Sequence, residues 1–162
     1  MHYAELTQML ILLSLANGSP VIAKQVFGEK YALPVDGNAR FIDGRPIFGP
    51  SKTIRGLLVS LLVTSLGAIL LDLPIWIGLL TAVTAMAGDL LSSFSKRRLG
   101  LASSAKATGL DQIPESLFPL LACRTELSLT AVDIVAACVV FFVGQVIFSS
   151  LFFQQRLRDR PY

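Results

Sequence analysis

Long apolar runs, separated by two polar stretches, dominate the pattern along the chain. The most continuous run covers residues 56–94 and contains only two charged side chains, Asp72 and Asp89. A helix needs about 20 apolar residues to cross a hydrocarbon core about 30 Å thick, so this run is long enough for two spans. Asp72 and Pro74 divide it, because proline ends a helix and aspartate favours a turn. The pattern therefore predicts two membrane-spanning helices joined by a tight turn.

Three further apolar runs complete the pattern. Residues 132–153 form a long span, and residues 6–23 form a weaker one that is interrupted by a polar Asn-Gly-Ser-Pro segment. Residues 110–122 are short and contain two prolines, so they can form a re-entrant or broken helix. Such backbone is tolerated at membrane depth only where protein or a wet cavity surrounds it. We predict a single all-α, polytopic membrane domain over residues 1–162, with about five transmembrane helices.

The composition indicates a membrane protein. The chain has 162 residues, of which 53% are hydrophobic and 15% charged, whereas soluble domains carry about 25% charged residues. This length leaves no room for a separate soluble domain of useful size. No lysine or arginine precedes Lys24, so the positive region of a signal peptide is missing and we expect the first run to be retained as a span. Cys123 and Cys138 lie in or beside apolar runs, where buried thiols are expected rather than a disulfide or a metal site.

The distribution of cations predicts the orientation in the membrane. With five spans, all but one of the 14 lysines and arginines would lie on one side, and only Arg124 on the other. The positive-inside rule places the cationic side in the cytoplasm. We therefore expect a multi-pass protein of the cell (inner) membrane with its N-terminus outside. Two long loops, at about residues 24–55 and 95–109, and the C-terminus would be cytoplasmic, so both loops can contribute to one polar site.

Asp89 is the most informative polar residue of the apolar runs. An ionised carboxylate in lipid costs about 2.5–3.5 kcal/mol on insertion scales, so it serves chemistry more often than solubility. On a helix, Ser92, Ser93 and Lys96 would share its face. Mg²⁺ prefers carboxylates and substrate phosphates as ligands, and neighbouring cations can hold phosphate oxygens. The alternative is that these cations only anchor the helix end and that Asp89 pairs with one of them. The cations in question are Lys96, Arg97 and Arg98.

A second carboxylate, Asp111, returns to the membrane surface after a loop of small residues. Two carboxylates beside a polycationic loop resemble a metal–nucleotide site, in which metal ions neutralise the charge that develops during phosphoryl transfer. The alternative is that Asp111 is the N-cap of the next helix. In the first long loop, glycines lie near Lys52, Arg45 and Arg55 and could bring backbone amides to an anion. Lipid-headgroup binding is the default interpretation of such a membrane-proximal basic segment.

Several blocks of these residues resemble the CDP-archaeol synthase family, which is related to the CDP-diacylglycerol synthases. The blocks are residues 41–49, 52–56, 88–100 and 109–112, together with Asn17 and Pro20 in the first span. The resemblance implies a five-helix membrane enzyme that uses CTP and Mg²⁺. Such an enzyme transfers a cytidylyl group to a lipid phosphate and releases pyrophosphate. The lipid could be an archaeol-type ether phosphate or phosphatidic acid, because apolar tails are recognised by groove shape.

The resemblance also implies roles for individual residues. Asp89 and Asp111 would hold the metal and act in catalysis together with Lys96. The residues implied to bind nucleotide or phosphate are Lys52, Thr53, Arg55, Ser92, Ser93, Arg97, Arg98, Asp43, Arg45 and Gln112. The expected partners are CTP, a lipid phosphate and the bilayer, with no nucleic acid, and a homodimer is left open.

Two other functions compete with the enzyme. A non-enzymatic membrane protein could bind anionic lipid or a partner through its cationic loops, and it would show no dependence on CTP or Mg²⁺. A small transporter could use Asp89 and Asp133 as intramembrane charges, and it would support flux across liposomes. The short chain and the lack of a second inverted half argue against the transporter.

Overall fold

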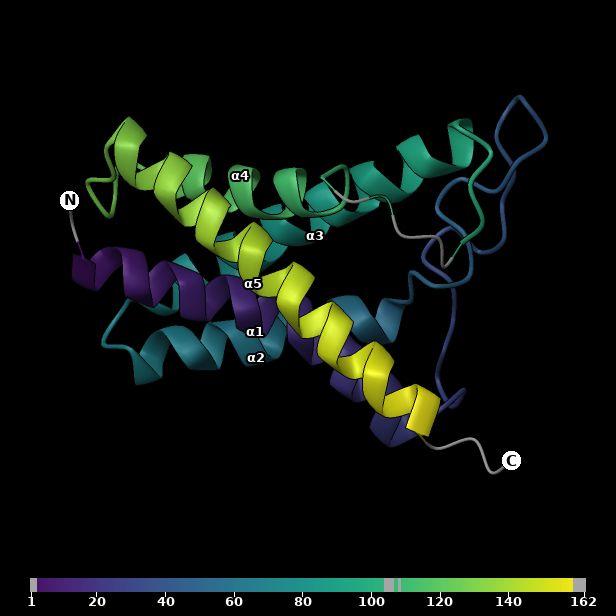
Figure 1. Ribbon diagram of the computed structural model, residues 1–162, viewed down its shortest axis with the longest axis horizontal. Coiled ribbons are helices and arrows are strands. Elements are labelled where there is room, and N and C mark those ends of the chain that lie inside the picture. Colours follow the sequence, from purple (N-terminus) through teal and green to yellow (C-terminus); the bar gives the residue numbers. More distant parts are fainter. Residues whose placement is uncertain (1–2, 104–106, 108, 159–162) are drawn as a thin grey trace.

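The computed structural model describes residues 3–103, 107 and 109–158. Within these ranges, side chains are described as far as Ile147. Within these residues the regular elements are five α-helices and no strand (Figure 1), which confirms the predicted all-α fold. The helices are α1 (Tyr3–Phe27), α2 (Ile54–Leu70), α3 (Ile75–Arg98), α4 (Gln112–Ala122) and α5 (Ala131–Arg158). Lys106 and Arg160, which entered the charge pattern, lie outside the described residues, as do the side chains of Arg156 and Arg158.

The connection between α2 and α3 is the predicted tight turn. It contains Asp72 with a φ of 57°, a left-handed conformation that aspartate tolerates better than most residues. Pro74 is the N-cap residue of α3. The two helices can pack closely because Gly78 lies directly against the backbone of Thr64, where a Cβ would collide. Local turn chemistry and a small contact residue together produce this hairpin.

Helix α1 is longer than the sequence predicts and runs through Pro20 without interruption. Proline has no backbone N–H, so the carbonyl of Ala16, four residues earlier, loses its helical partner. The buried hydroxyl of Ser60 on α2 donates a hydrogen bond to this carbonyl at 2.8 Å. A neighbouring helix thus supplies the missing donor, which is how proline is tolerated inside a membrane helix.

The second long loop begins later than predicted, because α3 continues to Arg98. Cations in the last turn of a helix favour its C-terminal end, and the last turn of α3 contains three of them. The chain then folds back along α3, since Ser92 donates a hydrogen bond to the carbonyl of Leu110 at 2.7 Å. Gly88 lies against the backbone of Pro114, so α4 starts well inside the bundle.

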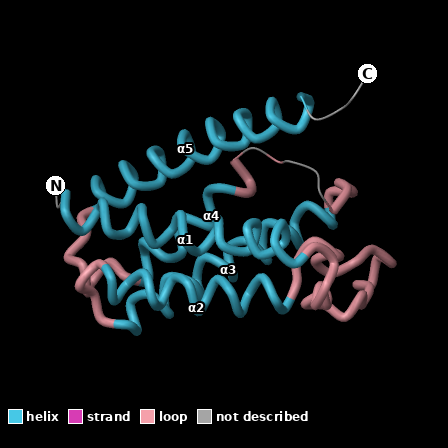
Figure 2. Tube along the Cα trace, turned by 90° about the horizontal axis from the view of Figure 1, so that it is seen from below, coloured by secondary structure: helices cyan, strands magenta, loops and turns pink. Residues whose placement is uncertain are grey.

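Helix α4 is the short fourth element that the sequence left open as a broken or re-entrant helix. Its 11 residues rise about 16 Å, roughly half of a hydrocarbon core. It packs between α3 and α5 (Figure 2), and Ser116 and Leu120 on its inner face are buried, so protein covers this side of the short helix.

Apolar side chains fill the centre of the bundle and also cover much of its outside. Met9, Leu12 and Leu13 of α1 are fully buried, together with Leu120 of α4. Helices α1 and α3 are each long and apolar enough to cross a membrane, and α2 and residues 131–147 are shorter apolar helices. Exposed leucines line the outer face of α2, as expected for contact with lipid. Cys123 is buried and Cys138 partly buried, and both are free thiols.

The polar loops gather at one end of the bundle. In Figure 1 the loop between α1 and α2 and the chain after α3 lie at the same end as the C-terminal end of α5, while α1 starts at the opposite end. The two loops touch, because the hydroxyls of Ser51 and Ser103 lie 3.0 Å apart. The predicted meeting of both loops is therefore present in the fold.

Candidate active site

A cavity of about 310 Å³ lies beneath the first long loop and between the helices. Its charged wall brings together side chains from four helices and the first long loop. These are Lys24 of α1, Glu29 and Lys52 of the loop, Arg55 of α2, Asp89 of α3 and Glu115 of α4. The rest of the wall is largely apolar. A small polar site enclosed by a membrane-type bundle is therefore present, and charged groups of both signs face it.

The central contact of the cavity is an ion pair between Lys52 and Asp89. The Lys52 ammonium donates to both carboxylate oxygens of Asp89, at 2.6 and 2.5 Å, and both side chains are mostly buried. The backbone around Lys52 is held in turn, because its carbonyl accepts a hydrogen bond from Val35 and its N–H donates to Gly49. The alternative that Asp89 pairs with the cations at the end of its own helix is wrong, since its partner comes from the other loop.

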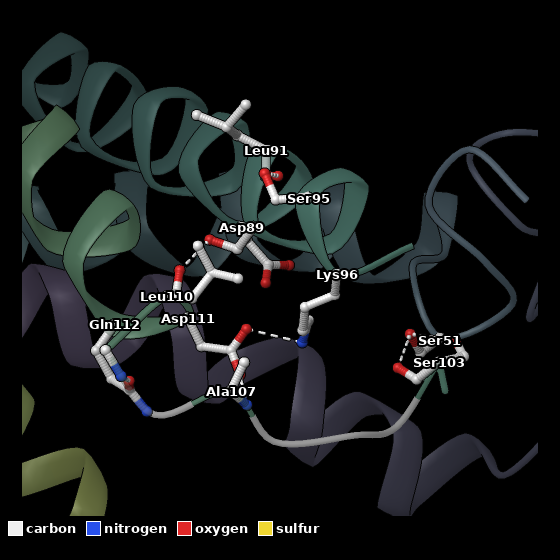
Figure 3. Close-up of polar contacts among 12 residues, drawn as sticks. Ser51, Asp89, Leu91, Ser95, Lys96, Ser103, Ala107, Leu110, Asp111 and Gln112 are labelled. Carbon is white, nitrogen blue, oxygen red and sulfur yellow. Dashed lines mark hydrogen bonds and ion pairs between the residues drawn. The ribbon is translucent and has the colours of Figure 1, made fainter. Parts of the chain in front are cut away.

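A second lysine–aspartate pair lies beside the chain that folds back along α3. Lys96 and Asp111 are 2.7 Å apart (Figure 3), and only 8% of the Lys96 side chain is exposed. The other carboxylate oxygen of Asp111 accepts a hydrogen bond from the backbone of Ala107. Asp111 is the N-cap residue of α4, as the alternative expected, but its side chain makes no capping hydrogen bond to that helix and is engaged by Lys96. Gln112 instead accepts from the N–H of Gly109, at 2.7 Å.

Glu115 of α4 is a site residue that the sequence reasoning missed. It is 8% exposed, lines the cavity together with Asp89 and lies within electrostatic range of the Asp89 carboxylate. It also lies within electrostatic range of Asp111, which itself does not line the cavity. Glu115 therefore connects the two lysine–aspartate pairs. Its spacing of four residues from Asp111, on one helical face, was a usable signal.

The end of α3 holds a separate cluster of cations built around Arg98. The guanidinium is 2.8 Å from Asp43 and donates to the carbonyl of Pro46 at 2.6 Å. It also makes cation–π contacts with the rings of Phe41 and Phe94, at 4.8 and 4.9 Å from their centroids. Arg98 thus attaches the first long loop to the helix end, and it is not part of the cavity wall.

Arg45 and Arg97 also bind backbone at this helix end. Arg45 donates to the carbonyls of Arg98 and Arg97, at 2.7 and 3.2 Å, which have no partner inside the helix. Arg97 donates to the carbonyl of Ala102 at 2.9 Å. We name Arg45, Arg97 and Arg98 the arginine cluster. Its members were predicted to bind phosphate, and their described contacts are instead to the loops and the helix end.

The remaining predicted residues divide between the cavity and the packing around it. Thr53 lines the cavity and caps α2 by accepting a hydrogen bond from the N–H of Gly56. Arg55 also lines it, while its guanidinium donates to the carbonyls of Gly28 and Lys30 at the end of α1. Ser92 and Ser93 are buried and do not line the cavity.

The donor set can be compared with the needs of a hard divalent cation. Within the residues the structure describes, no three histidine, cysteine, aspartate or glutamate side chains form a group able to hold a metal ion. The available carboxylates, Asp89 and Asp111, are each paired with a lysine. Asp89 lines the cavity and Asp111 does not. A single carboxylate such as Asp89 fits Mg²⁺, which commonly takes one or two carboxylates and completes its shell with water and substrate phosphates.

Asp133, invoked for a transporter, has a local role. Its carboxylate accepts hydrogen bonds from the backbone and hydroxyl of Thr130, and its own N–H donates back to that hydroxyl. This reciprocal arrangement is a helix cap at the start of α5. The observation removes one of the two charges on which the transporter hypothesis depended.

A lysine–aspartate pair in the wall of a cavity, with a second such pair nearby, inside an apolar helical bundle is the arrangement expected of a membrane-embedded enzyme that handles anionic substrates. Comparison with known proteins identifies the family: the profile of the CarS-like, CDP-archaeol synthase family matches residues 5–162. The chain belongs to this family of CTP-dependent membrane cytidylyltransferases, as its sequence blocks predicted. The non-enzymatic alternative is therefore not favoured.

Individual relatives show how far the similarity extends. The protein named CDP-archaeol synthase in Sulfurisphaera tokodaii is 33% identical over 153 residues, covering 91% of this chain and 89% of that protein. Its namesake in Hyperthermus butylicus is 41% identical over 104 residues, covering 60% and 59%. A solved structure described as an intramembrane enzyme for archaeal membrane lipids biosynthesis has a TM-score of 0.77 and 28% identity, covering 88% of this chain and 90% of that one. Fold and family thus agree along nearly the whole chain.

Proposed function

We propose that the protein transfers the cytidylyl group of CTP to the phosphate of an archaeol-type lipid, forming a CDP-lipid and pyrophosphate. The relatives named CDP-archaeol synthase favour this lipid over phosphatidic acid. The observation that carries the proposal is the Lys52–Asp89 pair, which two distant segments of the chain bring together in the wall of the cavity.

The reaction requires one bond to form and one to break. An oxygen of the lipid phosphate attacks the α-phosphorus of CTP, and the bond from that phosphorus to the oxygen bridging to the β-phosphate breaks. Pyrophosphate leaves with the electron pair. The attacking phosphate is already ionised at neutral pH, so the chain needs no strong base, and catalysis depends on positioning and charge neutralisation.

The two lysine–aspartate pairs supply the charges for this positioning. Lys52 and Lys96 are compact cations whose ammonium groups can turn from carboxylate to phosphate oxygens. Asp89 and Asp111 would hold Mg²⁺, which when bound would neutralise negative charge on the triphosphate. Thr53 and Arg55 would lie beside the nucleotide, since both line the cavity. In this proposal the arginine cluster acts indirectly, by holding the loops over the site.

The orientation in the membrane follows from the same arrangement. We infer five crossings, with the N-terminus outside and the long loops and C-terminus in the cytoplasm, where CTP is available. This is supported by the position of both loops at the end of the bundle where α5 finishes, opposite the start of α1 (Figure 1). Formation of a homodimer stays open in this proposal.

A direct assay tests the proposed activity. Purified protein would be incubated with radiolabelled CTP, Mg²⁺ and one lipid at a time: archaeol-type ether phosphate, phosphatidic acid, or the uncharged ether lipid. We expect labelled CDP-lipid mainly from the ether phosphate, none from the uncharged lipid, and loss of product on chelation of Mg²⁺. Absence of labelled product with every lipid phosphate would refute the proposed activity, and lipid binding without CTP turnover would favour the non-enzymatic function.

A further inference from the structure

Lys24, whose side chain is exposed, differs from the other cations of the cavity in having no hydrogen-bond or ion-pair partner among the described residues. Among the described residues, the cations that line the cavity are Lys24, Lys52 and Arg55. Lys52 is bound by the Asp89 carboxylate, and Arg55 donates to backbone carbonyls at the end of α1. No described hydrogen bond or ion pair engages the Lys24 ammonium. It is therefore the cation of this wall whose charge stays available to an anionic ligand.

Lys24 lies where the polar and apolar parts of the wall meet. On α1, Val21 precedes it by one turn on the same helical face, and both residues line the cavity. Leu57, Met86 and Leu90 continue the apolar part of the wall. A lysine at such a boundary can lay its methylene stem along apolar neighbours and hold its ammonium at the polar end. A ligand that meets these side chains needs an anionic head joined to an apolar body.

The acidic residues of the cavity wall do not cancel the attraction of Lys24 for an anionic ligand. Glu115 lies on α4 and is buried, and it makes no ion pair with Lys24 within the described residues. Glu29 lines the cavity as well and is exposed to solvent, and it makes no ion pair with Lys24 within the described residues. Lys24 therefore keeps a net attraction for phosphate, although Glu29 weakens it.

We propose that Lys24 binds the phosphate group of the lipid substrate, whose tails begin along the apolar wall formed with Val21. The inference rests on the proposed function. It adds to that function a residue that binds the lipid phosphate and does not bind CTP. The triphosphate of CTP is assigned to Lys52 and Thr53, which line the same cavity. A phosphate contacting Lys24 could chemically come from either substrate, so the two sources have to be separated by experiment.

The test measures KM for each substrate in variants of Lys24. Lys24→Gln should raise KM for the lipid phosphate about tenfold, the effect of losing one charge-assisted hydrogen bond, with KM for CTP unchanged. Lys24→Arg should restore most of the lipid affinity because it keeps the charge. The matched control is Lys30→Gln, an exposed lysine of the same loop region that does not line the cavity, and it should leave both constants unchanged. A rise in KM for CTP alone, or an equal effect of both glutamine variants, would overturn the assignment.

A binding measurement separates this inference from the proposed activity. Thermal stability in detergent would be compared with and without the ether lipid phosphate, in the absence of CTP, using the uncharged ether lipid as the reference. We expect the phosphate to stabilise the wild-type protein more than the Lys24→Gln variant. If wild type forms no CDP-lipid but shows this difference, the lipid site stands and the proposed activity fails. If CDP-lipid forms with equal lipid dependence in both proteins, the activity stands and the role of Lys24 fails.

Discussion

The lysines of the cavity wall and the arginine cluster lie close together in the fold but use their charges in different ways. In the cavity wall, Lys52 is paired with a carboxylate and Lys24 has no described partner. In the arginine cluster, Arg45, Arg97 and Arg98 all donate to backbone carbonyls, and Arg98 also makes cation–π contacts with aromatic rings. One region keeps charge available to a ligand, whereas the other uses charge to hold backbone in place.

The difference follows from the chemistry of the two side chains. The guanidinium of arginine is a planar fork with five N–H donors, which suits several carbonyls at once and the faces of aromatic rings. The ammonium of lysine is a compact, rotatable charge that can exchange one oxygen partner for another. We therefore expect substitutions in the two regions to change different measured quantities.

The largest effect is expected at the central carboxylate of the cavity. Asp89→Asn should lower kcat by about 100-fold or more, the magnitude typical of removing one key electrostatic group from an active site, while the protein stays folded and inserted. Product formation from labelled CTP and thermal stability in detergent would be measured together. Asp72→Asn is a suitable control, because Asp72 has a left-handed φ that asparagine also accepts, at the far end of the bundle. Turnover close to that of wild type in Asp89→Asn would exclude Asp89 from the mechanism.

A smaller effect is expected in the arginine cluster, where a substitution should lower the stability of the protein more than its activity. Arg98→Ala removes the ion pair with Asp43 and the hydrogen bond to Pro46, and it should lower the free energy of unfolding by about 1–3 kcal/mol. Thermal unfolding would report this loss, and kinetics on the folded fraction would report KM for CTP. A large rise in KM for CTP without any loss of stability would show that Arg98 binds the nucleotide directly.

The smallest effect concerns Asp36, whose carboxylate holds two parts of the first long loop together. Its carboxylate accepts hydrogen bonds from the backbone of Phe48, Gly49 and Asn38. Burial by itself would raise the pKa of Asp36, but these amide donors outweigh it and hold the pKa below its ordinary value. Stability from this group is therefore present above the unfolded pKa, near 3.8, and is lost as the pH falls through the lower folded pKa.

Comparison of the wild-type protein with Asp36→Asn isolates this contribution. Asparagine has one carbonyl oxygen and no charge, so the variant should be modestly less stable at neutral pH. The difference in Tm between the two proteins should shrink as the pH is lowered below about 4, where the carboxylate takes up a proton. A difference in Tm that is constant from pH 7 to pH 3 would contradict the charge dependence.

Much of the fold could be predicted from local sequence. The apolar run of residues 56–94, broken at Asp72 and Pro74, sufficed for the α2–α3 hairpin, because turn chemistry and span length are local properties. The two prolines in residues 110–122 indicated that the fourth helix would be irregular. Pro20 misled the prediction of α1, since Ser60 on another helix supplies the hydrogen bond that proline cannot make.

The residues of the candidate site, like the fold, could be predicted from the sequence only in part. The chain's residue types, their spacing and the family resemblance were enough to indicate an all-helical membrane cytidylyltransferase and to select Asp89, Lys52 and Asp111. Only the tertiary structure decided that Asp89 pairs with Lys52, that Glu115 joins the site, and that the arginines bind backbone. Ion pairs and carbonyl contacts form between segments far apart in the chain, and their free energy depends on distances that helix packing alone determines. Those distances cannot be predicted from the composition or the periodicity of the sequence.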